Sequence, residues 1–259
     1  MEWWGWGDCF FIISGYIITH VLTKETAGLF LFKRIFRIYP LYIVAMLSQL
    51  LVDKFIFHQP IPALKIVLAQ LLLVGDFFHA PYTLSGVEWT LRIEIMFYVF
   101  MALLKWAGFL NVYRKVLPLV LVGATFLLRI IGPFPSFEGV FVAYFTIYAP
   151  ILFIGVYFFL LEKKEIVPIK FLFFIANLLN QYFELIGQYW STWLGSHFLI
   201  ISLSIFAVAW INRTHMSSNA LIRFLSDLTF SVYLFHNWAW EPIKMLLQKY
   251  SINLLSSDL

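Results

Sequence analysis

The feature that most constrains this chain is a series of long, continuous hydrophobic runs. They lie near residues 9–22, 38–57, 63–79, 88–104, 112–131, 137–161, 167–186, 193–211 and 221–247. About twenty apolar residues in a helix, rising 1.5 Å each, cross a hydrocarbon core of roughly 30 Å. The runs lack the alternation of apolar and polar residues that marks the strands of a transmembrane barrel. The sequence therefore predicts an all-α, polytopic integral membrane protein with about eight or nine transmembrane helices.

The composition excludes several other classes of protein. Of the 259 residues, 62% are hydrophobic and only 12% are charged, whereas a soluble domain has roughly 25% charged residues. The single cysteine, Cys9, excludes a disulfide scaffold, and no spacing of His, Cys or Asp typical of a metal site is present. No run of Lys and Arg exceeds two residues, so the net charge of +4 does not predict nucleic-acid binding.

The distribution of Lys and Arg predicts which ends of the runs face the cytoplasm. Segment 23–37 holds the densest basic cluster and should be a cytoplasmic loop, because such loops are enriched in Lys and Arg. If all nine runs crossed, segments 105–115 and 163–170 would lie outside. If one run between 38 and 104 does not cross, twelve Lys and Arg are cytoplasmic and five are outside. The best candidate is 82–104, which carries three charged residues; we predict a re-entrant segment or a helix lining a polar cavity.

Two arginines in the basic segment form the first candidate site. Arg34 and Arg37 are three residues apart, so they share a face if the segment is helical. Two guanidinium groups on one face at a membrane surface can bind a phosphate bidentately. The alternative is that they only anchor the segment on the cytoplasmic side.

The second candidate site is the charged segment 87–98. Glu88 and Arg92 are four residues apart and can pair on one helix face, and Tyr98 lies one turn after Glu94. A carboxylate in an apolar helix is costly and therefore suggests function, either as a general base or as the partner that orients a histidine. The alternative is an internal ion pair that holds helices together.

Two further stripes carry polar side chains within apolar runs. In the last run, Tyr233 and His236 lie on one helix face, and His236 could bind substrate or move protons. In run 167–186, Asn177, Gln181 and Glu184 share a face and could line a cavity the size of a sugar. Hydrogen bonding between helices is the alternative for both stripes.

Four motifs of the chain form a recognisable set when they are taken together. In chain order they are Gly7-Asp8-Cys9-Phe10-Phe11-Ile12-Ile13-Ser14-Gly15-Tyr16-Ile17-Ile18-Thr19, Lys33-Arg34-Ile35-Phe36-Arg37-Ile38-Tyr39-Pro40, Glu88-Trp89-Thr90-Leu91-Arg92-Ile93-Glu94-Ile95-Met96-Phe97-Tyr98 and Ser231-Val232-Tyr233-Leu234-Phe235-His236-Asn237-Trp238. Each resembles a segment of the acyltransferase-3 family of bacterial membrane O-acyltransferases, and they occur in that family's order. The resemblance covers nearly the whole chain and implies a single transmembrane domain over 1–259.

The resemblance implies transfer of an acyl group, usually acetyl, from cytoplasmic acyl-CoA to a carbohydrate hydroxyl of a surface polysaccharide or a lipid-linked sugar. It implies a multi-pass protein of the bacterial cytoplasmic membrane, in contact with lipid, with acyl-CoA as co-substrate and no bound cofactor. The residues expected at the site fall into three groups. These are Arg34, Arg37 and Lys33 for the donor phosphates, Glu94 and His236 for catalysis, and Trp89, Tyr233 and Asn177 for the acceptor.

The sequence departs from the family's pattern at both ends. Family members have an earlier helix in which a basic residue precedes a histidine, taken to be catalytic, by eleven positions. Here Cys9 stands eleven positions before His20, and Leu47 before His58. The chain thus resembles a family member without its first and last helices. The alternatives are an inactive remnant of the family, a structural partner in polysaccharide export, and a small-solute transporter or flippase, although the inverted repeats of transporters are not evident.

Overall fold

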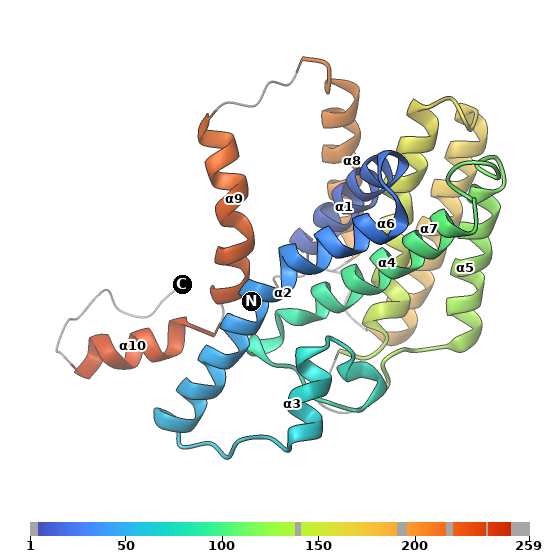
Figure 1. The fold of residues 1–259 in the computed structure, drawn as a ribbon. Coiled ribbons are helices and arrows are strands. Elements are labelled where there is room, and N and C mark those ends of the chain that lie inside the picture. Colours follow the sequence, from blue (N-terminus) through green and yellow to red (C-terminus); the bar gives the residue numbers. More distant parts are fainter. Residues whose placement is uncertain (1–4, 138–140, 191–195, 216–219, 237, 250–259) are drawn as a thin grey trace. The chain divides into compact units, whose positions relative to one another are not determined.

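The computed structural model describes residues 5–137, 141–190, 196–215, 220–236 and 238–249, and over these residues the regular structure is entirely helical (Figure 1). In chain order the elements are α1 (Gly5–Lys24), α2 (Ala27–Phe55), α3 (Leu64–Leu71), the 3-10 turns η1 (Gly75–Phe77) and η2 (Leu84–Gly86), α4 (Glu88–Trp106), α5 (Leu117–Ile131), α6 (Tyr144–Glu162), α7 (Pro168–Tyr189), α8 (Ser196–Ile211), α9 (Ala220–Phe235) and α10 (Trp240–Lys249). The all-α class predicted from the sequence is confirmed for this part of the chain.

Three of the described helices are long and apolar enough to cross a membrane. They are α2, α6 and α7, while α5 and most of α8 are apolar but shorter. The lengths and the apolar composition of these helices therefore indicate a helical membrane protein. The number of eight or nine spans stays a prediction.

Run 63–79 does not form the membrane-length helix that its hydropathy suggested. Its helix, α3, has eight residues, which is about 12 Å of rise and too short for a bilayer. The chain turns at Leu73, whose φ is 57°, and continues into η1. Segment 82–104, predicted to be re-entrant or to form a helix that lines a polar cavity, contains η2 and the continuous, 19-residue α4, and its position in the membrane stays a prediction.

The predicted loop 23–37 is also mostly helical. Helix α2 begins at Ala27, so the basic motif lies in its first turns rather than before it. Pro40 lies inside this helix without ending it. The motif residues Arg34 and Arg37 therefore have the i, i+3 spacing on a regular helix that the sequence analysis assumed.

The chain divides into two compact units. One comprises residues 1–35 and 92–216, and the other comprises 36–91 and 217–259. In the first unit α6 is the central helix, with every side chain from Tyr144 to Leu160 buried. It packs against α1, α5 and α7, and α1 also packs against α8. A helix that is apolar on all sides is expected at such a central position.

Two glycines allow α1 and α6 to approach each other closely. A Cβ atom on Gly15 would lie 1.9 Å from the backbone oxygen of Leu152, and one on Gly155 would lie 2.1 Å from that of Ile12. Small residues permit this kind of backbone contact between membrane helices. Gly15 belongs to the first of the four sequence motifs, and its role is thus close packing in the core of the first unit.

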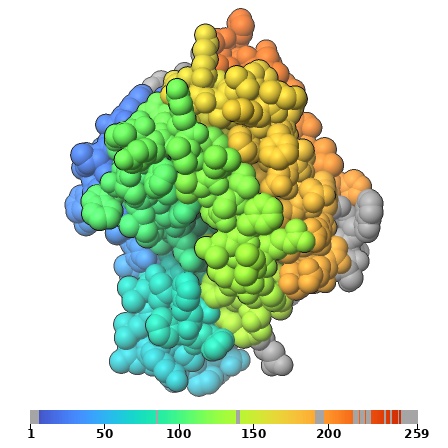
Figure 2. Space-filling model, turned by 90° about the vertical axis from the view of Figure 1, so that its right-hand side faces the viewer, coloured from blue at the N-terminus to red at the C-terminus, as the bar shows by residue number. Residues whose placement is uncertain are grey.

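The outer faces of α5 and α7 lie next to one another and expose large apolar side chains, on the side seen in Figure 2. The exposed residues include Leu119, Phe126 and Ile130 on α5 and Ile169, Leu172 and Phe173 on α7. Soluble monomers rarely expose large contiguous apolar patches. The exposed apolar side chains of α5 and α7 are what a lipid-facing surface requires.

Hydrogen bonds join the elements of the second unit. The hydroxyl of Tyr42 on α2 donates to the backbone oxygen of Gln70 on α3, at 2.8 Å. The side-chain oxygen of Gln49 accepts from the backbone N–H of Leu84. These bonds attach α3 and η2 to the C-terminal half of α2.

Candidate functional site

Arg34 lies against two aromatic rings in the first unit. Its guanidinium carbon is 5.3 Å from the ring centroid of Phe30 and 5.9 Å from that of Tyr98. The two rings contact each other edge to face, with their centroids 5.8 Å apart. Cation–π attraction at these distances holds the half-buried guanidinium in place. Its Nε is buried and donates no hydrogen bond within the described part of the chain.

Tyr98 connects this arginine to the predicted catalytic carboxylate. Its hydroxyl donates a hydrogen bond to Oε1 of Glu94, one turn earlier on α4. The Glu94 side chain is only 8% exposed. The structure thus brings together Arg34 and Glu94, which the sequence analysis had assigned to separate sites, through one tyrosine side chain.

The other two predicted donor-binding residues are at the surface. Nζ of Lys33 is 2.5 Å from Oε1 of Glu25 and forms an ion pair with it. Arg37 lies one turn after Arg34 on α2, and its side chain is exposed. Lys33 therefore already has a carboxylate partner, while Arg37 presents its guanidinium to the surroundings of the protein.

The start of α4 is buried in the second unit. Oε1 of Glu88 accepts from the backbone N–H of Thr83 and from its hydroxyl, the latter at 3.1 Å. Glu88 and Trp89 are buried, and Arg92, one turn after Glu88, is fully buried too. The predicted pairing of Glu88 with Arg92 and the predicted acceptor contact of Trp89 stay predictions.

Tyr233 and His236 lie near the end of α9 in the same unit. The Tyr233 hydroxyl is hydrogen-bonded to the Thr90 hydroxyl and donates to the backbone oxygen of Val87, at 2.9 Å. Nδ1 of the exposed His236 is 2.7 Å from the backbone oxygen of Tyr233. If Nδ1 donates there, Nε2 is the basic nitrogen of the neutral ring. Tyr233 therefore attaches α9 to the beginning of α4, as the interhelical alternative proposed.

The polar stripe on α7 mainly joins α7 to α5. Nε2 of Gln181 donates to the backbone oxygen of Thr125 at 3.0 Å, and Glu184 pairs with Arg129. Asn177 is half-buried. These contacts favour a role in helix packing for Gln181 and Glu184. The acceptor-binding role of Asn177 stays a prediction.

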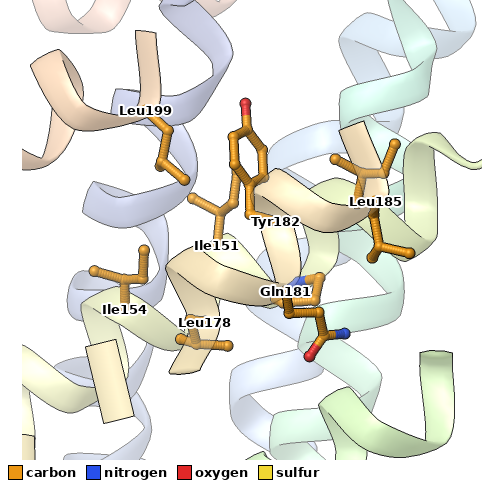
Figure 3. Close-up of a pocket in the computed structure, with 9 residues that line it drawn as sticks. Ile151, Ile154, Leu178, Gln181, Tyr182, Leu185 and Leu199 are labelled. Atoms are coloured by element: carbon orange, nitrogen blue, oxygen red, sulfur yellow. The ribbon is translucent and has the colours of Figure 1, made fainter. Parts of the chain in front are cut away.

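A small cavity lies beside this stripe, between α6, α7 and α8 (Figure 3). Apart from Gln181 and Tyr182, its walls are aliphatic side chains, among them Ile151, Ile154 and Leu178. The Gln181 amide already bonds to α5. The cavity therefore lacks the polar groups that a sugar requires, and it does not correspond to the predicted sugar site.

The described residues contain no group of three His, Cys, Asp or Glu side chains that could hold a metal ion. Instead, they place a cation, an aromatic ring and a buried carboxylate in contact within a helical membrane protein.

Comparison with known proteins identifies the class more closely. A family model described as an acyltransferase domain matches residues 8–257, and the chain belongs to this acyltransferase-3 family.

A viral protein is also similar to part of the chain. The "Putative acetyltransferase ORF330" of Acidianus two-tailed virus is 36% identical over 72 residues, which cover 28% of this chain and 21% of the viral protein. The chain thus aligns with about a fifth of that relative's length. No solved structure matches the chain.

Proposed function

We propose that the protein is a membrane O-acyltransferase that moves an acyl group, most simply acetyl, from acyl-CoA to a carbohydrate hydroxyl. The observation that carries the proposal is the contact series Arg34–Tyr98–Glu94, in which a positioned cation and a buried carboxylate share one tyrosine. Membership of the acyltransferase family supports the same reaction class. The acceptor is a surface polysaccharide or a lipid-linked sugar, and the location implied by the resemblance is the bacterial cytoplasmic membrane.

Arg34 and Arg37 bind the phosphates of the acyl donor in this proposal. Coenzyme A carries several phosphate charges, and guanidinium groups bind phosphate through paired N–H donors. Arg34 is suited to this role because the rings of Phe30 and Tyr98 hold its half-buried cation in place. The exposed Arg37, one turn later, would add a second contact.

The carboxylate of Glu94 acts as the general base. It takes the proton from the acceptor hydroxyl while that oxygen attacks the thioester carbonyl carbon. The new C–O ester bond forms, the C–S bond breaks, and the CoA thiolate leaves and receives the proton. The Tyr98 hydroxyl, which donates to Glu94, holds the carboxylate in position. His236, Trp89, Tyr233 and Asn177 remain the residues expected toward the acceptor.

The proposal is tested with radiolabelled acetyl-CoA and membranes that contain the full chain. Arg34→Ala should raise the KM for acetyl-CoA roughly 10- to 150-fold, because a hydrogen bond to a charged group contributes about 1.5–3 kcal/mol. Arg34→Lys should recover only part of this, since Lys cannot stack or bind bidentately. Lys170→Ala, at an exposed lysine of α7, serves as the control. An unchanged KM in Arg34→Ala, with normal amounts of protein, would refute the phosphate-binding role.

A further inference from the structure

Three basic side chains gather at the end of the first unit where α1, α6 and α8 finish. Nζ of Lys163 is 3.0 Å from Oε1 of Glu162, and Nε of Arg213 is 3.4 Å from Oε2 of the same carboxylate. The charges of Lys24 and Lys163 both lie within electrostatic range of the His20 ring. Lys24, Lys163 and Arg213 thus form one group, which we call the basic cluster.

The basic cluster carries more positive charge than its carboxylate partner neutralises. Glu162 is shared between the two cations that bond to it. Lys24 is exposed in the last turn of α1. The residue after it, Glu25, is paired with Lys33 instead. The three cations and Glu162 together leave an excess of two positive charges, which favours an anionic ligand.

The cations of the cluster are held in place and remain partly accessible. The guanidinium carbon of Arg213 is 4.3 Å from the ring centroid of Trp210, and Nζ of Lys163 is 5.5 Å from that of Phe159. The two basic side chains are 39% and 40% exposed. Arginine and lysine have more N–H donors than the contacts with Glu162 and Trp210 use. The remaining donors can bind phosphate oxygens.

Exposed apolar side chains lead along α1 and α8 to the basic cluster. On α1, Ile13 and Ile17 are exposed, and Lys24 follows Ile17 after about two helical turns, so it lies on the same face. Helix α8 packs against α1 and exposes Ile205 and Val208. The surface of these two helices therefore combines an apolar stripe with a positively charged end.

A phospholipid with an anionic headgroup has both parts that such a surface can bind. Its phosphate accepts hydrogen bonds from Lys and Arg, and its acyl chains pack on exposed apolar side chains. Basic groups between helices on the cytoplasmic side of membrane proteins bind headgroups of this kind. The distribution of Lys and Arg predicts that this end of the unit is cytoplasmic. A soluble anion would not use the apolar stripe, and a zwitterionic lipid brings a cation of its own toward the cluster.

We propose that the basic cluster binds the headgroup of an anionic phospholipid whose acyl chains lie along α1 and α8. The bound lipid joins the ends of α1, α6 and α8. The site uses none of the residues assigned to acyl transfer. Either proposal can therefore fail without the other.

Native mass spectrometry of the full chain in a neutral detergent tests the lipid site directly. Phosphatidylglycerol and phosphatidylcholine with identical acyl chains are titrated, and the Kd of the first bound lipid is measured. The test variant carries Lys24→Gln and Lys163→Gln, which leave Arg213 bonded to Glu162. The matched control carries Lys115→Gln and Lys170→Gln, two exposed lysines on the same predicted side of the membrane.

We expect the wild type and the control to bind phosphatidylglycerol more tightly than phosphatidylcholine. The test variant should bind phosphatidylglycerol roughly thirtyfold more weakly, because each basic residue near an anionic lipid surface contributes about a fivefold factor. Lys24→Arg with Lys163→Arg keeps both charges and should bind like the wild type. Equal affinity for the two lipids in the wild type, an equal loss in the control, or a loss in the arginine variant would overturn the proposal. Displacement of the lipid by coenzyme A or inorganic phosphate would overturn it too, since the ligand of the cluster would then be a soluble anion.

Discussion

Tyr98 is the side chain on which the candidate catalytic cluster depends, because its ring and its hydroxyl have different partners. The ring contacts the Arg34 cation and the hydroxyl bonds to Glu94. The two contacts can therefore be removed separately. Variants that remove only one of the two contacts can therefore distinguish a role of Tyr98 in donor binding from a role in catalysis.

Tyr98→Phe should lower kcat for acyl transfer and leave the KM for acetyl-CoA nearly unchanged. The loss should be roughly 10- to 150-fold, because a hydrogen bond to a carboxylate contributes about 1.5–3 kcal/mol. Tyr98→Leu should in addition raise the KM roughly 2- to 30-fold, because a cation–π contact contributes about 0.5–2 kcal/mol. Steady-state kinetics on membranes measure both constants, with Tyr113→Phe, at an exposed tyrosine, as the control. Equal kcat in the wild type and Tyr98→Phe would show that this hydrogen bond has no part in catalysis.

The residues of the site were predictable from the sequence to the extent that local spacing decides their position. The i, i+4 spacing of Glu94 and Tyr98 places them in contact on any regular helix. The contact between Arg34 and Tyr98 joins α2 to α4, and no sequence spacing encodes it. Phe30 was overlooked because a single aromatic residue in an apolar run has no pattern. Its contact with the Arg34 cation is visible only in three dimensions.

At the scale of the elements, hydropathy predicted the helices well and their lengths less well. Run 167–186 became the 22-residue α7, close to its predicted length, whereas run 137–161 contains the shorter, 19-residue α6. Run 63–79 is as apolar, yet it turns at Leu73, and run 221–247 is divided into α9 and α10. A window of hydropathy measures how apolar a segment is and carries no information on where its backbone leaves the helix.

The crossing of α1 and α6 gives a prediction about stability. Gly15→Ala should destabilise the protein by about 1–3 kcal/mol, the usual cost of overpacking, because the added Cβ would lie 1.9 Å from the Leu152 oxygen. Gly123→Ala on α5 meets no atom within 4 Å. It should be neutral or stabilising, since alanine favours a helix by up to about 1 kcal/mol over glycine. Thermal unfolding of both variants in detergent measures the difference, and equal melting temperatures would contradict the close helix contact.

At the scale of the whole molecule, the short α3 is a candidate for the run that does not cross the membrane. The basic segments share the cytoplasmic side only if one run between 38 and 104 does not cross, and α3 is too short to cross. Ion pairs in the first unit agree with this arrangement. Nη1 of Arg114 is 3.1 Å from Oε1 of Glu165, and Nε of Arg213 is 3.4 Å from Oε2 of Glu162. They bring the segments after α4, α6 and α8 to one end of that unit.

The orientation can be measured with single cysteines in a Cys9→Ser background. Lys115→Cys and Lys170→Cys replace exposed residues on the predicted cytoplasmic side, and Gln59→Cys lies on the predicted outer side. In intact cells a membrane-impermeant maleimide should label position 59 alone, and all three should react once the membrane is permeabilised. Labelling at both 115 and 170 in intact cells would mean that the run forming α3 is not the missing crossing. With segment 23–37 in the cytoplasm, segments 105–115 and 163–170 would then lie on the opposite side, and the basic clusters would not share one face of the membrane.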